Sequence, residues 1–205
     1  MSVSKENEEE EEIKVILIGN TQVGKTSLIN IAMGYGFNEN EKGTSASYYR
    51  LKKLIVNKKE YTVNLWDTIG QEKFRQLTKI FYNNSKIVIF VYDITDKNSF
   101  EALPAWIKDV QNQLGDDYIK GLVGNKSDLF EKEEVNEEEG IEFANNFGAK
   151  FLLTSAKNNN PSEIKNYLTE LVREYLLKRK RGDTGSFSLN RESIREKKNK
   201  NINCF

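Results

Sequence analysis

The sequence has no histidine and few of the residues on which several classes of function depend. Its 205 residues include one cysteine, two prolines and no long unbroken apolar run. A single cysteine cannot form an internal disulfide, and the lack of histidine removes the commonest metal ligand and general base. Without a long apolar run we expect no membrane-spanning helix, and the polar, acidic start predicts no secretory signal. Any catalysis must therefore proceed without a histidine base.

The charges balance overall, with 31 Lys+Arg against 31 Asp+Glu, but they are distributed unevenly. Residues 1–12 hold six Glu and one Lys, whereas residues 178–205 hold nine Lys or Arg and three Asp or Glu. Neither end shows apolar periodicity, so neither is expected to bury enough surface to offset its ordering entropy. The sequence predicts one domain at residues 13–177, between a disordered acidic tail (1–12) and a disordered basic tail (178–205).

Strand and helix patterns alternate along this domain. Nearly continuous apolar runs, typical of strands buried on both faces, occupy residues 13–19, 87–93 and 119–124. Shorter strands are predicted at 51–56, 61–66 and 151–153, the first two joined as a hairpin. Helices are predicted at 25–33, 98–114, 136–147 and 161–176. The pattern predicts an α/β fold with a six-stranded, mostly parallel sheet and helices on both faces, a three-layer arrangement.

A glycine-rich loop follows the first predicted strand. Residues 19–26 (GNTQVGKT) match G-x-x-x-x-G-K-[ST], directly before a predicted helix. Backbone N–H groups in such a loop surround phosphate oxygens, Lys25 would reach the β- and γ-phosphates, and the Thr26 hydroxyl would ligate Mg²⁺. The alternative is a glycine-rich turn with a solvated lysine. The loop alone predicts a nucleoside triphosphate site and leaves kinases, ATPases and GTPases open.

The segment after the hairpin carries a second group of candidates. Asp67 closes the strand, where a carboxylate can hold Mg²⁺ through water, and the Gly70 N–H could meet a γ-phosphate. Gln71 could orient the attacking water, which suits a site without histidine because phosphoryl transfer depends mainly on positioning and charge. The alternative is an ordinary turn at a strand end.

Two later segments indicate the base. Asn125-Lys126-Ser127-Asp128 follows the strand at 119–124, and a carboxylate such as that of Asp128 can accept two hydrogen bonds from guanine N1–H and N2–H₂. Adenine offers no matching donors on that edge. Ser155-Ala156-Lys157 follows the last strand, where a backbone N–H could meet the guanine O6. Either segment alone would be uninformative, but in this order and at these strand ends they favour GTP over ATP.

With these motifs in order, residues 13–177 resemble the Ras superfamily of small GTPases, and most closely the Rab branch. The Rab resemblance rests on WDTIGQEKF (66–74), Phe81-Tyr82 and VYDITDKNSF (91–100). It implies a P-loop G domain that acts as a GTP/GDP switch with Mg²⁺ and hydrolyses GTP slowly. The implied regulators and partners are effectors, exchange factors and GTPase-activating proteins.

The resemblance also assigns roles to individual residues. It implies metal ligation by Thr26, Thr44 and Asp67, and catalysis by Gln71 and Lys25. It implies that Phe37 stacks on guanine, although an ordinary core aromatic is the alternative. The remaining implied nucleotide contacts are Gly19, Thr21, Gln22, Val23, Gly24, Ser27, Gly70, Asn125, Lys126, Asp128, Ser155, Ala156 and Lys157. An aromatic trio for effectors would be Tyr49, Trp66 and Phe81, although strand aromatics are more often part of a core.

Departures from the family pattern bear on rate and regulation. Ser45-Ala46 stand where Ile-Gly is common, and Ile69 replaces a small residue before the switch glycine. Thr21-Gln22 add bulk to the phosphate loop, so slow turnover is expected. An alternative function is a binding module or scaffold that retains GTP and hardly hydrolyses it. A P-loop kinase or ATPase is disfavoured by residues 125–128.

The basic tail ends in Asn203-Cys204-Phe205. Rab-like tails usually end in prenylated cysteines, so Cys204 is a candidate for lipidation, with an unmodified thiol as the alternative. One lipid gives marginal membrane affinity, and the basic tail could supply the second signal. We expect a cytoplasmic monomer that cycles to the cytosolic face of an intracellular membrane and regulates vesicle traffic. Nucleic acid is disfavoured as a partner because no aromatic platform accompanies the basic charge.

Overall fold

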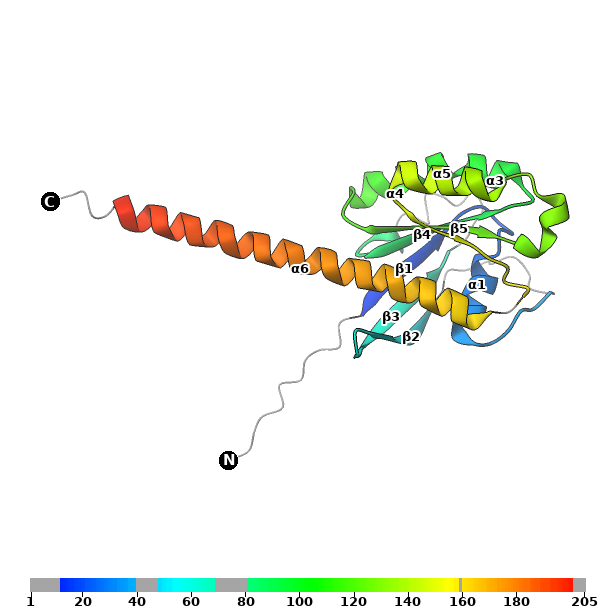
Figure 1. Cartoon of the computed structure of the whole chain (residues 1–205), viewed down its shortest axis with the longest axis horizontal. Coiled ribbons are helices and arrows are strands. Elements are labelled where there is room, and N and C mark those ends of the chain that lie inside the picture. The colour runs from blue at the N-terminus through cyan, green and yellow to red at the C-terminus, as the bar shows by residue number, and fades with distance from the viewer. Residues whose placement is uncertain (1–11, 40–47, 69–80, 159, 201–205) are drawn as a thin grey trace, which may run out of the picture.

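The computed structural model describes residues 12–39, 48–68, 81–158 and 160–200, with side chains described as far as residue 181. Figure 1 shows a sheet with helices on both faces and a last helix that runs on beyond the sheet. Among these residues no helix has an apolar stretch long enough to cross a lipid bilayer.

One six-stranded sheet forms the middle layer. Its strands are β1 (Ile13–Ile18), β2 (Tyr48–Val56), β3 (Lys59–Asp67), β4 (Ile87–Asp93), β5 (Ile119–Asn125) and β6 (Lys150–Leu153). They lie in the order β2-β3-β1-β4-β5-β6. The β2–β3 pair is antiparallel and every other neighbouring pair is parallel. The predicted α/β class and the mostly parallel six-stranded sheet are confirmed.

Helices cover both faces of this sheet. They are α1 (Lys25–Met33), α3 (Lys97–Glu101), α4 (Leu103–Leu114), α5 (Glu137–Phe147) and α6 (Pro161–Lys200), with a 3₁₀ segment, η2 (Ser127–Lys132). Helices α1 and α6 pack on one face, and α4 and α5 pack on the other (Figure 1).

The strand β1 explains why the central runs are apolar throughout. Val15 and Leu17 point into the core beneath α1 and α6, whereas Ile16 and Ile18 point into the core beneath α4 and α5. Successive side chains of a strand alternate between the faces, so a strand covered on both sides has no position for an exposed residue. Two separate cores therefore hold the same strand rigidly from both sides.

The structure differs from the predicted elements in four places. The hairpin turn is tighter than predicted because Asn57 and Lys58 adopt left-handed φ values of 51° and 64°, which suit a two-residue turn between twisted strands. The helix predicted at 98–114 divides into α3 and α4 at Ala102. The 3₁₀ segment η2 was not predicted, and α6 continues past residue 177. The ends of the domain and the disorder of the two tails stay predictions.

Parallel strands bring the candidate motifs together. The carboxyl ends of β1, β3, β4, β5 and β6 lie at one edge of the sheet, because all five strands run in the same direction. The glycine-rich loop follows β1, Asn125 ends β5, and the segments beginning at residues 126 and 154 follow β5 and β6. The topology therefore concentrates motifs that lie more than 100 residues apart in the sequence.

Candidate functional site

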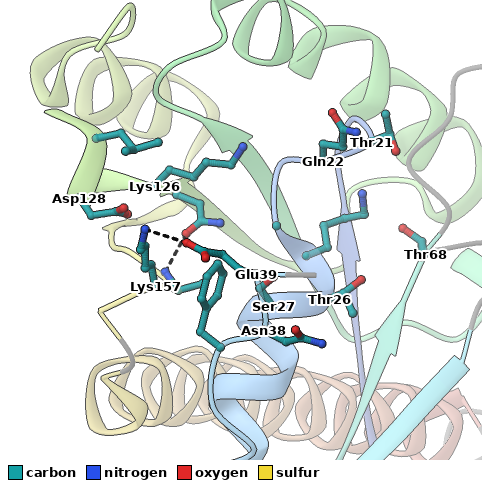
Figure 2. A pocket seen from close by; sticks show the side chains of 16 residues that line it. Thr21, Gln22, Thr26, Ser27, Asn38, Glu39, Thr68, Lys126, Asp128 and Lys157 are labelled. Atoms are coloured by element: carbon teal, nitrogen blue, oxygen red, sulfur yellow. Dashed lines mark hydrogen bonds and ion pairs between the residues drawn. The ribbon is translucent and has the colours of Figure 1, made fainter. Parts of the chain in front are cut away.

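A cavity of about 420 Å³ opens at this edge (Figure 2). Its walls come from the glycine-rich loop and the start of α1, from the connection between α1 and β2, and from the segments after β3, β5 and β6. The residues that line it are Thr21, Gln22, Gly24, Lys25, Thr26, Ser27, Phe37, Asn38, Glu39, Thr68, Asn125, Lys126, Asp128, Leu129, Ala156 and Lys157. The volume suits a ligand of small-molecule size.

The glycine-rich loop ends at the N-terminus of α1. Gly24 caps this helix with φ 96°, a left-handed conformation that side chains rarely adopt. The first turn of α1 contains no acidic residue. The backbone N–H groups and the positive dipole end at the N-terminus of α1 therefore favour an anion at this end of the cavity.

Lys25 places a buried ammonium beside the loop. Its Nζ donates hydrogen bonds to the backbone oxygens of Gly19 at 2.9 Å and Asn20 at 2.8 Å. Burial lowers the pKa of Lys25 to about 8, and the nearby charge of Asp67 acts in the opposite direction. A bound phosphate would supply further negative charge to this cation.

Oxygen ligands for a divalent cation stand next to Lys25. The Thr26 hydroxyl donates a 2.6 Å hydrogen bond to the fully buried carboxylate of Asp67. Tyr48, which the sequence did not indicate, faces Asp67 across the antiparallel pair. Burial raises the pKa of the Tyr48 hydroxyl, and the charge of Asp67 raises it further. Hydroxyl and carboxylate oxygens are the donors that Mg²⁺ prefers. Thr26 and Asp67 therefore fit the predicted metal.

Asn125 joins the separate walls of the cavity. Its Nδ2 donates to the Val23 backbone oxygen at 2.8 Å, and its Oδ1 accepts from the Ala156 backbone N–H at 3.1 Å. The side chain is buried, so each bond is shielded from water. Asn125 thus fixes the glycine-rich loop and the segment after β6 relative to each other.

The far wall holds Asp128 by a short hydrogen bond from the Ser155 hydroxyl. Ser155 Oγ in turn accepts from the backbone N–H groups of Lys157 and Asn158, each at 3.1 Å. Lys126, at φ 69°, pairs with Asp93 at 2.5 Å. These contacts hold the Asp128 carboxylate at the cavity, where it can accept hydrogen bonds from a ligand.

Phe37 and Glu39 form a wall opposite this segment. Phe37 lines the cavity and is 37% exposed, so it is not the ordinary core aromatic considered as an alternative. Glu39 contacts Lys157 across the cavity, and Figure 2 shows their side chains directed toward one another. Neither Glu39 nor its neighbour Asn38 was predicted at the site.

The predicted residues thus fall into three groups. Most line the cavity directly, and Gly19, Val23, Ser155 and Asp67 support it through the hydrogen bonds described above. Thr44, Gly70, Gln71 and Cys204 lie outside the described residues, as do Ser45, Ala46 and Ile69. Sequence reasoning missed Asn38, Glu39 and Leu129, for which no motif gave a signal, and Thr68, which lies within the WDTIGQEKF segment but was given no role.

The aromatic trio is assembled away from the cavity. The rings of Tyr49 and Trp66 stack with centroids 5.1 Å apart, and the Phe81 ring centroid lies 5.8 Å from that of Trp66. Lys14 Nζ sits 4.5 Å from the centre of the Trp66 ring. Tyr49 is 54% exposed, whereas Trp66 and Phe81 are partly buried and Trp66 packs against the core beneath α4 and α5. The cluster is therefore open to a partner mainly through Tyr49.

Comparison with known proteins agrees with this geometry. A model described as the Ras family matches residues 14–177. Ras-related protein Rab-21 of Geodia cydonium is 40% identical over 144 residues, 70% of this chain and 63% of that protein. The Rab-21 proteins of Bos taurus and Homo sapiens are each 40% identical over 146 residues, 71% of this chain and 66% and 65% of theirs. The matched part of the chain thus spans just under two thirds of these relatives. Because the family model covers most of the chain, this protein belongs to the Ras family of small GTPases, and it is a Rab-like member.

Proposed function

We propose that the protein is a GTP/GDP switch that binds guanine nucleotide with Mg²⁺ and hydrolyses GTP slowly. The observation that carries the proposal is one cavity formed by an anion-binding helix N-terminus, a buried lysine and a carboxylate held at the opposite wall. Family membership supports the same function.

Each end of the cavity suits one part of the nucleotide. Lys25 and the N-terminal N–H groups of α1 would neutralise the phosphates, and Asp128 would accept hydrogen bonds from the guanine edge. Phe37 would stack on the base. Thr26 and Asp67, with Thr44 from the predicted motif, would hold Mg²⁺, which supplies charge stabilisation at the β- and γ-phosphates when it is bound.

Hydrolysis would depend on residues that position water. Gln71 is proposed to orient the attacking water, and Lys25 to stabilise charge on the transferred phosphoryl group. Relatives of this class turn over at about 10⁻⁴ to 10⁻² per second unaided, and activators add roughly 10³- to 10⁵-fold. The protein would therefore function as a timer whose lifetime is set by partner proteins.

A second candidate is a binding module that retains GTP without appreciable hydrolysis. It is favoured by Thr21 and Gln22, whose side chains both line the cavity beside the phosphate-binding elements (Figure 2). Bulk at this place would obstruct the attacking water or an incoming arginine.

The first experiment is to denature the purified protein and identify any released nucleotide by chromatography. GDP would support a cycling switch, and GTP would support the retaining module. Multiple-turnover GTP hydrolysis then separates the two functions. A protein that carries no guanine nucleotide and takes up neither GDP nor GTP with Mg²⁺ would overturn both.

The resemblance to Rab proteins extends the proposal to the cell. We propose effector, exchange-factor and activator partners, an attachment to the cytosolic face of an intracellular membrane through Cys204 and the basic tail, and a role in vesicle traffic. The stacked surface of Tyr49, Trp66 and Phe81 is the proposed effector contact. The protein is proposed to act as a monomer without nucleic acid.

A further inference from the structure

An ion pair crosses the cavity between two segments that are distant in the sequence. Lys157 Nζ lies 3.0 Å from Glu39 Oε1, and the two residues are 118 positions apart. Glu39 belongs to the connection between α1 and β2, whereas Lys157 belongs to the segment after β6. Figure 2 draws this contact at the cavity, with both side chains directed across it.

The pair connects the walls assigned to the base. Glu39 stands two residues after Phe37, and both line the cavity. Lys157 stands on the opposite wall, where its backbone N–H shares Ser155 Oγ with Asp128. The contact therefore joins the wall that carries the aromatic ring to the wall that carries the base-selecting carboxylate.

We propose that Glu39 and Lys157 form a clasp that slows release of the bound purine nucleotide. The inference rests on the proposed function of this cavity as a nucleotide site. By tying residues 37–39 to the segment after β6, the clasp keeps the two walls together around the base. Release then requires that this contact opens first.

Lys157 is directed to Glu39 although a second carboxylate is close. The pKa of Lys157 is raised mainly by its hydrogen bond to Glu39 and by the charge of Glu39, while desolvation opposes this and the charge of Asp128 adds less. Pairing with Glu39 leaves Asp128 available to a guanine edge. The clasp therefore serves retention without competing for the group that selects the base.

The exposure of the Glu39 and Lys157 side chains limits how much the clasp can change the dissociation rate. The two side chains are 54% and 73% exposed, so solvent and salt screen their attraction. An ion pair of this kind changes an equilibrium or a rate by roughly two- to five-fold. The clasp should therefore tune the dissociation rate and should not decide whether nucleotide binds.

The test measures dissociation of a fluorescent GDP analogue chased with excess GDP. Glu39→Gln, Lys157→Met, which keeps most of the aliphatic stem, and the double variant are compared with the unaltered protein. We expect each single variant to release the analogue about two- to five-fold faster. The double variant should be no faster than the faster single variant, because both changes remove the same contact.

The matched control is Glu60→Gln. Glu60 pairs with Lys53 at 2.6 Å on the β2–β3 hairpin, is 50% exposed against 73% for Glu39, and does not line the cavity. This variant makes the same charge change and should leave the dissociation rate unaltered. Raising the salt concentration should accelerate release from the unaltered protein more than from Glu39→Gln.

The outcomes separate the clasp from the proposed function. If the unaltered protein binds no guanine nucleotide, both proposals are overturned. If it binds GDP but Glu39→Gln releases the analogue at the unaltered rate, the clasp alone is overturned. Strictly additive effects in the double variant, or equal acceleration in Glu60→Gln, would also overturn it.

Discussion

At the scale of single residues, Gly24 stands closer to a neighbouring side chain than a residue with a Cβ could. A Cβ built on Gly24 would lie 2.1 Å from Asn125 Nδ2, the atom that donates to the Val23 backbone oxygen. The glycine thus allows the glycine-rich loop to approach the end of β5 closely. The lack of a side chain at Gly24 leaves room for Asn125, whose hydrogen bonds connect the glycine-rich loop with the segment after β6.

Gly24→Ala should therefore impair both folding and nucleotide binding. The left-handed φ of 96° costs an alanine about 1–2 kcal/mol, and the contact with Asn125 adds to this. We expect a lower unfolding temperature and guanine nucleotide affinity reduced about tenfold or more, equivalent to about 1.4 kcal/mol. Thermal unfolding and titration with labelled GDP measure the two effects.

The control for this prediction is Gly34→Ala. Gly34 has a similar φ of 84°, but a Cβ added to it would meet no atom within 4 Å, and it caps the other end of α1. It should show the conformational cost alone, with nucleotide affinity unchanged. Equal losses of affinity in the two variants would contradict the role of the Gly24–Asn125 contact.

Asp128→Asn should change the preferred base. In the proposed role the Asp128 carboxylate would accept two hydrogen bonds from guanine, whereas an amide can accept one and donate one. Xanthine carries an oxygen where guanine carries its amino group, so the variant should bind XDP in preference to GDP. Competition between the two nucleotides for a labelled analogue measures the change, and Asp117→Asn, exposed and paired with Lys178, is the control. Unchanged preference for GDP would refute the assigned role of Asp128.

At the scale of elements, the sequence predicts best where burial is periodic. The runs in β1, β4 and β5 are apolar at nearly every position because helices cover both faces of the sheet. This pattern clearly indicates strands that are buried on both sides. Asn136 and Glu139 form the predicted capping box, with each side chain bonded to the other's backbone N–H. In these elements the local signal and the tertiary environment agree.

The prediction was weaker where tertiary contacts override the local pattern. The apolar periodicity at 98–114 continues through Ala102, but Asp96 and Ser99 hold α3 as a separate turn against β4. Lys126 takes a left-handed φ just before η2 and pairs with Asp93, and neither feature has a signature in a single sequence. Such contacts depend on residues that are remote in the chain.

Helix α4 also contacts the glycine-rich loop, through a hydrogen bond that the sequence did not reveal. Trp106 is buried, and its Nε1–H donates a 2.8 Å hydrogen bond to Asn20 Oδ1 in the glycine-rich loop. Trp106→Phe should destabilise the fold by about 1–3 kcal/mol through the lost bond and the reduced packing. Because the glycine-rich loop loses its hydrogen bond to α4, we also expect weaker GDP binding.

Asn20→Ala isolates the hydrogen bond from the packing. If Asn20 acts through Trp106, adding Trp106→Phe to this variant should weaken GDP binding little further, while still lowering the unfolding temperature. Calorimetric binding and thermal unfolding of the four proteins give both quantities. Fully additive losses of affinity would contradict a connection between α4 and the loop.

At the scale of the whole molecule, the site exists because one sheet edge collects five strand ends. The motif residues could be predicted since each has its own local pattern, such as the spacing of Gly19, Gly24 and Lys25. The remaining lining residues could not be predicted in this way, because Asn38 and Glu39 belong to no motif and reach the cavity only through the path of the chain between α1 and β2. The sequence therefore identified the motif residues that line the cavity more completely than the residues between them.

The uneven charge of the chain leads to a prediction about membranes. Residues 178–205 combine a strong positive charge with Cys204 next to the end, whereas the described helices include none that could span a bilayer. A single lipid binds membranes marginally, and basic residues near an anionic surface add about 1 kcal/mol each.

If Cys204 is lipidated in cells, Cys204→Ser should move most of the membrane-bound protein to the cytosol, as fractionation and immunoblotting would measure. Asn203→Ser, the neighbouring control, should leave the distribution unchanged. Equal membrane fractions for both variants would refute the anchor, and release by high salt alone would assign the attachment to the basic residues.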